Sequence, residues 1–179
     1  MRHFLANIIT YAIATLLFLG AAAFAWMRSS QLLLADEPTF ISRYAPAEDL
    51  EFHWHDLGRQ SYARNCTNCH GSDGTGWDQY PPLTGIATLH ALPGGPEYLI
   101  DLHLYGLASD RWGAPMPVMG HIHDVELAAV INHIIAGFGG AAGDFTPFQP
   151  RDIAARRGQQ LSPRDVDEQR PGEAYDPRQ

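Results

Sequence analysis

The chain has 179 residues and a formal net charge of −8 at pH 7, a length that suggests one domain with appendages. All twelve basic residues are arginines, and residues 29–143 hold four of them against thirteen acidic residues, a net charge of −9. Such acidity excludes the basic surface that a nucleic acid needs and favours a partner with a basic docking surface, although solubility alone would also explain it.

The first predicted element is an apolar helix over residues 4–27. No Asp, Glu, Lys or Arg lies between Arg2 and Arg28. Crossing the hydrocarbon of a bilayer takes roughly 20 helical residues, so residues 1–28 are expected to be a single transmembrane anchor. A cleaved signal peptide is the alternative, because Ala23-Phe24-Ala25 satisfies the small-x-small cleavage rule, although the apolar region of a signal peptide is usually only about 7–15 residues.

Residues 29–50 are predicted to be a linker. They contain Pro38, Pro46 and scattered charges, although Leu32-Leu33-Leu34 could prolong the anchor helix. A flexible linker would let the following domain sample several docking positions near a membrane.

The only two cysteines lie in the motif Cys66-Thr67-Asn68-Cys69-His70, at the end of a helix predicted over residues 57–69. Cys-x-x-Cys-His is typical of covalent attachment of one c-type haem. Residues three apart share a face of a helical turn, so both thiols can reach the two vinyl groups of one porphyrin, and His70 can reach the iron. A redox disulfide would not need the histidine, and a zinc site would lack a second cysteine pair.

Two further helices are predicted downstream. Gly95-Pro96-Glu97 opens the first, with proline at the first position and an acid in the first turn, and Gly106 ends it. Asp124 begins the second, where its negative charge suits a helix N-terminus. The apolar stripe of this helix consists of Leu127, Val130, Ile131, Ile134 and Phe138.

Residues 144–179 are predicted to be an extended or disordered tail. They hold six arginines, seven acidic residues and repeated prolines, with few large apolar residues. This composition buries too little apolar surface to form a core, although residues 151–157 could form a helical turn or two.

Taken in chain order, these motifs resemble those of a class I, monohaem cytochrome c domain of the membrane-anchored bacterial type. The resemblance covers residues 56–138, about half of the chain, and departs from the family at His133, where an aromatic residue commonly packs on the glycine of the first helix. The matching segments are Gly58 and Tyr62 at the Gly-x-x-x-aromatic spacing, Cys66–His70, the proline loop Tyr80-Pro81-Pro82-Leu83, the methionine loop Ala114-Pro115-Met116-Pro117, and Asp124–Phe138.

The resemblance implies an all-α fold, a small cytochrome c fold of about three to five helices around the haem, within residues 51–143. It implies that the Pro81 carbonyl accepts a hydrogen bond from His70 Nδ1–H, and that Pro82 and Leu83 cover the proximal face of the haem. Trp112 and Tyr80 are expected to pack on the haem or to hydrogen-bond a propionate.

The second axial ligand is expected to be Met116, because the family's ligand lies in a Met-Pro pair. Met119 is the alternative. The remaining candidates are two His-x-His pairs, His53/His55 and His121/His123, which are expected to be unliganded surface residues but could displace Met116 or bind another metal.

The resemblance implies one-electron transfer in a respiratory chain by a carrier that is not itself an enzyme. The alternative is a haem subunit of a terminal oxidase, a nitric oxide reductase or a periplasmic dehydrogenase, and an open distal site would suit a gas sensor or a peroxidase. The expected partners are redox proteins with a basic docking patch. Because the family attaches its haem outside the cytoplasm, the expected location is the inner membrane, with the haem domain on the periplasmic side.

Overall fold

The structure, a computed structural model, describes residues 11, 13–24, 44–45, 52–108, 110–140 and 145–172. The chain divides into two compact units, Met1–Arg43 and Tyr44–Gln179. The predicted linker over residues 29–50 lies outside the described residues except for Tyr44 and Ala45.

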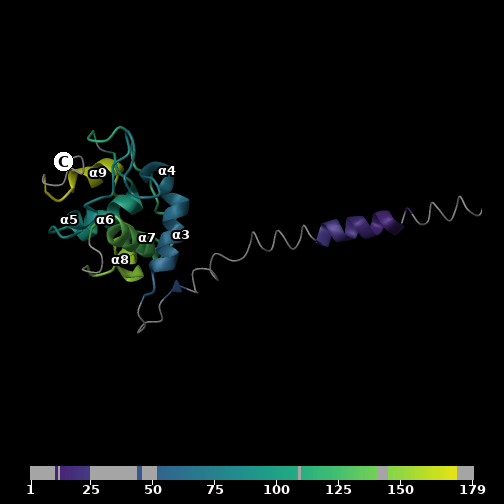
Figure 1. Cartoon of the computed structure of the whole chain (residues 1–179). Coiled ribbons are helices and arrows are strands. Elements are labelled where there is room, and N and C mark those ends of the chain that lie inside the picture. Colours follow the sequence, from purple (N-terminus) through teal and green to yellow (C-terminus); the bar gives the residue numbers. More distant parts are fainter. Residues whose placement is uncertain are drawn as a thin grey trace, which may run out of the picture. The chain divides into compact units, whose positions relative to one another are not determined.

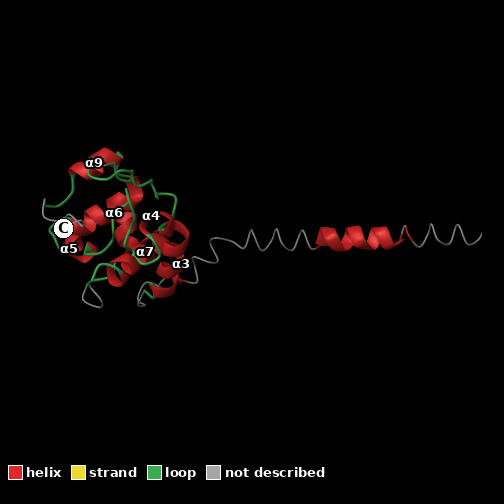
Figure 2. Ribbon diagram, turned by 45° about the horizontal axis from the view of Figure 1, so that its top comes forward, coloured by secondary structure: helices red, strands yellow, loops and turns green. Residues whose placement is uncertain are grey.

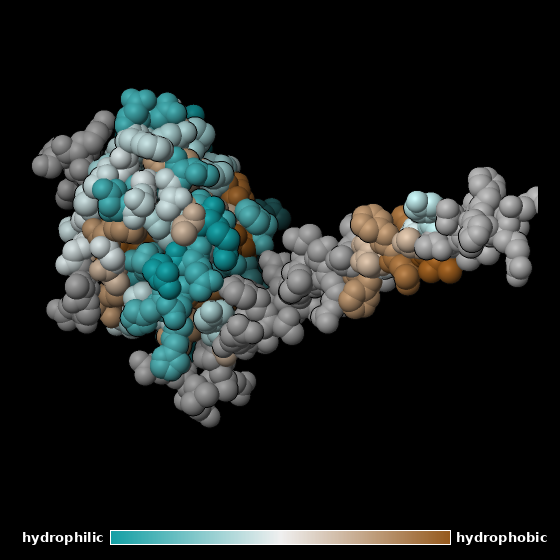
Figure 3. All heavy atoms as spheres, turned by 45° about the vertical axis from the view of Figure 1, so that its right-hand side comes forward, coloured by the Kyte–Doolittle hydropathy of each residue, from teal (hydrophilic) through white to brown (hydrophobic). Residues whose placement is uncertain are grey.

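In the first unit, Tyr11 and residues 13–24 are helical, and their side chains are exposed. Large apolar side chains such as Leu16, Leu17 and Phe18 are among them, and Figure 3 shows this helix as a largely apolar surface. The ends of the predicted helix over residues 4–27 lie outside the described residues. Among the residues that are described, no helix is both long and apolar enough to cross a membrane.

The second unit is helical, as predicted (Figures 1 and 2). Its described residues form no strand, and they contain only two isolated β-bridges, Trp77–Tyr80 and Leu107–Met116. The helices are α3 (His55–Asn65), α4 (Thr67–His70), α5 (Ile86–His90), α6 (Gly95–Tyr105), α7 (Asp124–Gly137), α8 (Pro150–Arg156) and α9 (Pro163–Glu168).

The predicted helices differ from the observed ones mainly at the cysteine motif. The helix expected over residues 57–69 is two helices, α3 and α4, which meet at Cys66 with φ −119° and ψ −31°. The helix that opens at Gly95-Pro96-Glu97 is confirmed as α6, which Gly106 caps. The helix expected from Asp124 is confirmed as α7, and Phe138 caps it. The short helix α5 has no counterpart in the prediction.

Gly58 allows α3 to approach α7 closely. A Cβ atom at Gly58 would lie 2.3 Å from the Ala129 carbonyl oxygen and 2.8 Å from the Cβ of His133. His133 nevertheless takes part in the ring packing expected of an aromatic residue, since its centroid lies 5.5 Å from that of Tyr62 and 5.6 Å from that of Phe138. The family's helix contact is therefore kept at this site with an imidazole in place of the usual ring.

The core of the domain lies around α7. The apolar stripe predicted for this helix is buried, apart from Phe138, which is half-buried. Leu57 from α3 and Leu99 and Leu104 from α6 are also buried. Helix α7 is buried on nearly every side from Val125 to Asn132, and α6 from Tyr98 to Leu104, so these two helices form the centre of the apolar core.

The tail differs from its prediction, because residues 150–168 contain two helices that pack on the domain. Each begins with a proline and a capping box, in which Asp152 and Asp165 bond back to the preceding backbone. Ile153 and Val166 are each fully buried. The helical turns allowed over residues 151–157 are confirmed as α8, whereas the expectation of an extended or disordered tail is wrong for the rest of this segment. One buried anchor and a capping box per helix compensate for the low apolar content.

Buried polar contacts attach this tail to the helices of the core. Asn132 of α7 donates to the Phe148 carbonyl (2.9 Å) and accepts from the Phe148 amide (2.8 Å). The Arg156 guanidinium bonds both carboxylate oxygens of Asp101, which is buried on α6. Because Asn132 and Asp101 are buried, the position of α8 is specified by hydrogen bonds as well as by packing.

Candidate haem site

Nearly all the predicted site residues line one cavity. It has a volume of about 1100 Å³, including its opening to solvent. The cysteine motif, the proline loop, α6, the methionine loop and α7 all contribute to its wall, and most of the lining is apolar. The predicted residues in the lining are Cys66, Cys69, His70, Tyr80, Pro81, Pro82, Leu83, Trp112, Met116 and Met119.

The two cysteines lie at this cavity and form no disulfide with each other, Cys66 buried and Cys69 partly exposed. Burial, and to a smaller extent Cys69, raises the pKa of the Cys66 thiol to about 12. A redox-active dithiol depends on a thiolate of low pKa, so this environment does not favour disulfide exchange. The described part of the chain has no group of three His, Cys, Asp or Glu side chains arranged to hold a metal ion.

His70 is held by the hydrogen bond that was predicted for it. Its Nδ1 lies 2.9 Å from the Pro81 carbonyl oxygen, which can only accept, so Nδ1 carries the proton and Nε2 carries the lone pair. Burial lowers the pKa of His70, and the bond to Pro81 partly opposes this shift. The imidazole is therefore neutral near pH 7, which is the state that binds a metal.

A short backbone pairing fixes the loop that carries Met116. The Met116 amide donates to the Leu107 carbonyl (2.8 Å), and the Leu107 amide donates to the Met116 carbonyl (3.0 Å). Gly106 has a φ of +79°, and a Cβ atom there would lie 2.8 Å from the Met116 carbonyl oxygen. Met119 is buried, and its amide donates to the His103 carbonyl (3.0 Å).

The donor set fits a covalently held haem. Two thiols, two imidazoles (His70 and His103) and two thioethers line a single, mostly apolar cavity. Thiols can bond the vinyl groups, and imidazole and thioether are ligands that haem iron takes in electron-transfer proteins.

The comparisons with known proteins agree with this geometry. A family model described as cytochrome c matches residues 56–136. Two proteins named cytochrome c-552, both from Thermus thermophilus, are each 35% identical to the chain over 119 residues. The match covers 61% of this chain, and 90% and 80% of the two relatives, respectively. The chain belongs to the cytochrome c family. Its cofactor is therefore haem c, attached through Cys66 and Cys69, and the predicted class I domain is confirmed.

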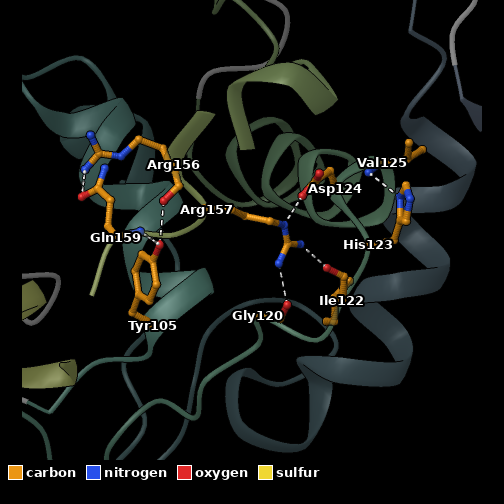
Figure 4. A network of polar contacts seen from close by, with 9 residues as sticks. All are labelled: Tyr105, Gly120, Ile122, His123, Asp124, Val125, Arg156, Arg157 and Gln159. Atoms are coloured by element: carbon orange, nitrogen blue, oxygen red, sulfur yellow. Dashed lines mark hydrogen bonds and ion pairs between the residues drawn. The ribbon is translucent and has the colours of Figure 1, made fainter. Parts of the chain in front are cut away.

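In this cytochrome, the segment that follows the methionine loop is hydrogen-bonded to the tail. The guanidinium of Arg157, which follows α8, donates to the carbonyls of Gly120 and Ile122 and to the Asp124 carboxylate (Figure 4). In the same network, the Tyr105 hydroxyl donates to the Arg156 carbonyl (2.6 Å). One side chain from the tail therefore connects the residues after Met119 to the first residue of α7.

The cytochrome also has a haem-cavity residue that the sequence reasoning missed, His103. This side chain is 5% exposed, and its Nδ1 lies 2.7 Å from the Leu99 carbonyl oxygen. Burial lowers the pKa of His103 to about 4, against the bond to Leu99, with a further lowering by His70. Helical spacing could have found it, since Leu99 and Leu102 share its face of α6. Arg170, which also lines the cavity, comes from the tail and has no such local signal.

The two His-x-His pairs lie away from the cavity. His53, His55, His121 and His123 are all exposed, and none is in its lining. His55 stacks on Trp54 with a centroid distance of 3.8 Å, and His123 Nδ1 accepts from the Val125 amide at the start of α7. Local packing and helix capping therefore explain one histidine of each pair.

Proposed function

We propose that this cytochrome is a membrane-anchored one-electron carrier of a respiratory chain, with His70 and Met116 as the two axial ligands. The observation that carries the proposal is that the His70 ring and the Met116 side chain line one cavity beside Cys66 and Cys69. When bound there, haem supplies a reversible one-electron couple, and a thioether ligand favours its ferrous form and raises its potential.

The protein's contribution is to hold both ligands still. The Pro81 carbonyl fixes the tautomer and the orientation of His70. Met116 is paired with Leu107 through both its amide and its carbonyl, and the flanking Pro115 and Pro117 restrict the loop. Ligands that need not move between oxidation states keep the reorganisation on electron transfer small.

The ligand assignment is tested by the near-infrared sulfur-to-iron band of the oxidised protein. Met116→Ala should abolish this band. Met119→Leu is the matched control and should retain it, because leucine fills a similar volume without a sulfur. A band that survives Met116→Ala and disappears in Met119→Leu would assign the ligand to Met119.

For the anchor, the support is the uncharged run between Arg2 and Arg28 and the exposed apolar side chains of the described helix. The proposed location is the inner membrane, with the haem domain in the periplasm. The full chain should stay in the membrane fraction in high salt, and a variant lacking residues 1–28 should be released. A mature N-terminus just after Ala25 would show instead that the segment is a cleaved signal peptide.

The proposed partner is a membrane oxidase, reductase or dehydrogenase with a basic docking surface, which the net charge of −9 over residues 29–143 favours. Extraction in mild detergent followed by native-mass sizing tests whether the association is transient. A lone cytochrome supports a free carrier. Stoichiometric co-purification with other subunits would contradict it and make the chain a fixed haem subunit.

A further inference from the structure

His103 is a buried imidazole at the haem cavity that His70–Met116 ligation leaves without a function. It lies on α6 within the face that also presents Leu99 and Leu102 to the cavity. A histidine in such an apolar wall loses hydration and gains only one bond inside the protein, from Nδ1 to the Leu99 carbonyl. An apolar side chain would fill the same place without this loss of hydration.

The bond to Leu99 determines which nitrogen of His103 has a lone pair available for a metal ion. A carbonyl oxygen only accepts, so Nδ1 carries the proton and Nε2 keeps its lone pair. Because Nδ1 is directed back along α6, Nε2 is the ring atom left to face the cavity that the residue lines. His70 shows the same arrangement, in which the Pro81 carbonyl accepts a hydrogen bond from Nδ1–H and the lone pair of Nε2 is available for a metal ion.

Backbone hydrogen bonds place His103 beside the methionine loop. The Met119 amide donates to the His103 carbonyl (3.0 Å), and one turn later along the chain Leu107 pairs with Met116. The end of α6 and the segment 116–119 therefore run side by side and share a wall of the cavity. His103 belongs to the wall that carries Met116, whereas His70 comes from α4.

We propose that His103 is a reserve axial ligand, whose Nε2 takes the iron position that Met116 vacates and so gives His70–His103 ligation. The proposal rests on the His70–Met116 ligation proposed above. Imidazole is a suitable ligand for haem iron, and it lacks the thioether's preference for the ferrous form. Loss of Met116 would then leave a six-coordinate iron with a lower reduction potential. Without His103 the iron would be five-coordinate and open to small ligands such as carbon monoxide.

The test compares Met116→Ala with the double variant Met116→Ala/His103→Leu, in the haem-loaded full chain. Leucine suits the apolar wall and removes the imidazole. The matched control is Met116→Ala/His121→Gln, which removes an exposed histidine outside the cavity. His103→Leu alone should keep the near-infrared band, which shows that the substitution leaves the fold and Met116 ligation intact. The readouts are the electron paramagnetic resonance spectrum of the ferric form and carbon monoxide binding to the ferrous form.

The proposal predicts a low-spin, bis-imidazole ferric spectrum for Met116→Ala and for the His121 control, and a high-spin spectrum for the His103 double variant. If His103 occupies the position about nine-tenths of the time, the double variant should bind carbon monoxide roughly tenfold more tightly than Met116→Ala. Equal high-spin spectra with and without His103 would overturn the reserve ligand alone. A sulfur band that persists in Met116→Ala would also overturn it, by assigning the position to Met119. Failure of the parent assignment is distinguishable, because it shows as a band that is missing from the wild-type protein or that persists in Met116→Ala.

Discussion

Gly58 lets two helices approach closely because it has no side chain. Alanine is normally favoured over glycine within a helix by about 1 kcal/mol. Here the added Cβ would lie 2.3 Å from the Ala129 carbonyl oxygen, so α3 and α7 would have to separate. We expect Gly58→Ala to lower the free energy of unfolding by about 1–3 kcal/mol, measured by denaturant unfolding of the haem-loaded protein.

Gly137→Ala is the matched control for this prediction. Gly137 ends α7, and a Cβ atom there would meet only His133 Cε1, at 3.8 Å, an ordinary contact. This variant should be neutral or slightly stabilising. Equal effects of the two substitutions would show that close approach at Gly58 does not limit the packing of α3 against α7.

Tyr98 gives the domain a predicted sensitivity to alkaline pH. Burial raises the pKa of Tyr98 to about 12, whereas an unfolded tyrosine ionises near pH 10. The unfolded chain therefore loses this proton first, so the contribution of Tyr98 is constant below about pH 10 and falls as the pH rises towards 12. The expected loss of stability from this residue is about 2 kcal/mol.

Tyr98→Phe tests that prediction, because phenylalanine fills the same space without an ionisable group. Denaturant unfolding at about pH 9 and about pH 11.5 should show a smaller alkaline loss in the variant than in the wild-type protein. Burial also raises the pKa of Tyr62, to about 12. Because both proteins keep Tyr62, its contribution to the alkaline loss is the same in each and does not affect the comparison. Identical alkaline losses would contradict the assignment to Tyr98.

At the level of the elements, the tail stabilises the methionine loop through Arg157. This side chain donates to the carbonyls of Gly120 and Ile122, which follow the methionine loop, and to the Asp124 carboxylate. The Arg157–Asp124 ion pair is only partly exposed. Arg157→Ala should lower stability by about 1–3 kcal/mol, an amount reduced from that of a fully buried pair by solvent screening. The near-infrared band should also disappear at a lower temperature than in the wild-type protein, because the end of the loop loses its support.

Arg164→Ala provides the control within the same tail. The Arg164–Asp110 pair is 3.9 Å apart, and its side chains are 74% and 100% exposed. Exposed pairs of this kind contribute little, so this variant should leave the melting of the band unchanged. A matching effect of both substitutions would indicate general loosening of the tail in place of a specific contact with the methionine loop.

The helices and the site differ in how far the sequence could predict them. Helix α6 was predictable because Pro96 and Gly106 mark its ends, and α7 because its apolar stripe repeats at helical spacing. The tail was predicted only as far as a helical turn or two over residues 151–157, because the docking of α8 depends on contacts such as Asn132 with Phe148 and Arg156 with Asp101, which join distant segments. His70, Pro81 and Met116 carry local motifs. His103 carries only its helical spacing from Leu99, which an ordinary core residue of α6 would share.

For the whole molecule, the acidic charge should control the rate of encounter with partners. With a net charge of −8, attraction to a cationic electron acceptor weakens as salt shortens the range of the field to about 10 Å at 0.1 M. Stopped-flow rates with a small cationic complex should fall, roughly tenfold or less, as ionic strength rises from about 10 to about 200 mM. Rates with an anionic complex should rise. The same salt dependence with both reagents would contradict electrostatic steering.

We infer that His70 and Met116 hold one haem c in both oxidation states. A redox titration of the haem-loaded full chain, followed in the visible and near-infrared with carbon monoxide added to the reduced protein, tests this ligation. We predict a single one-electron wave, a sulfur-to-iron band that returns at each reoxidation, and no carbon monoxide binding at neutral pH. Ready carbon monoxide binding, or an oxidised form without that band, would contradict it.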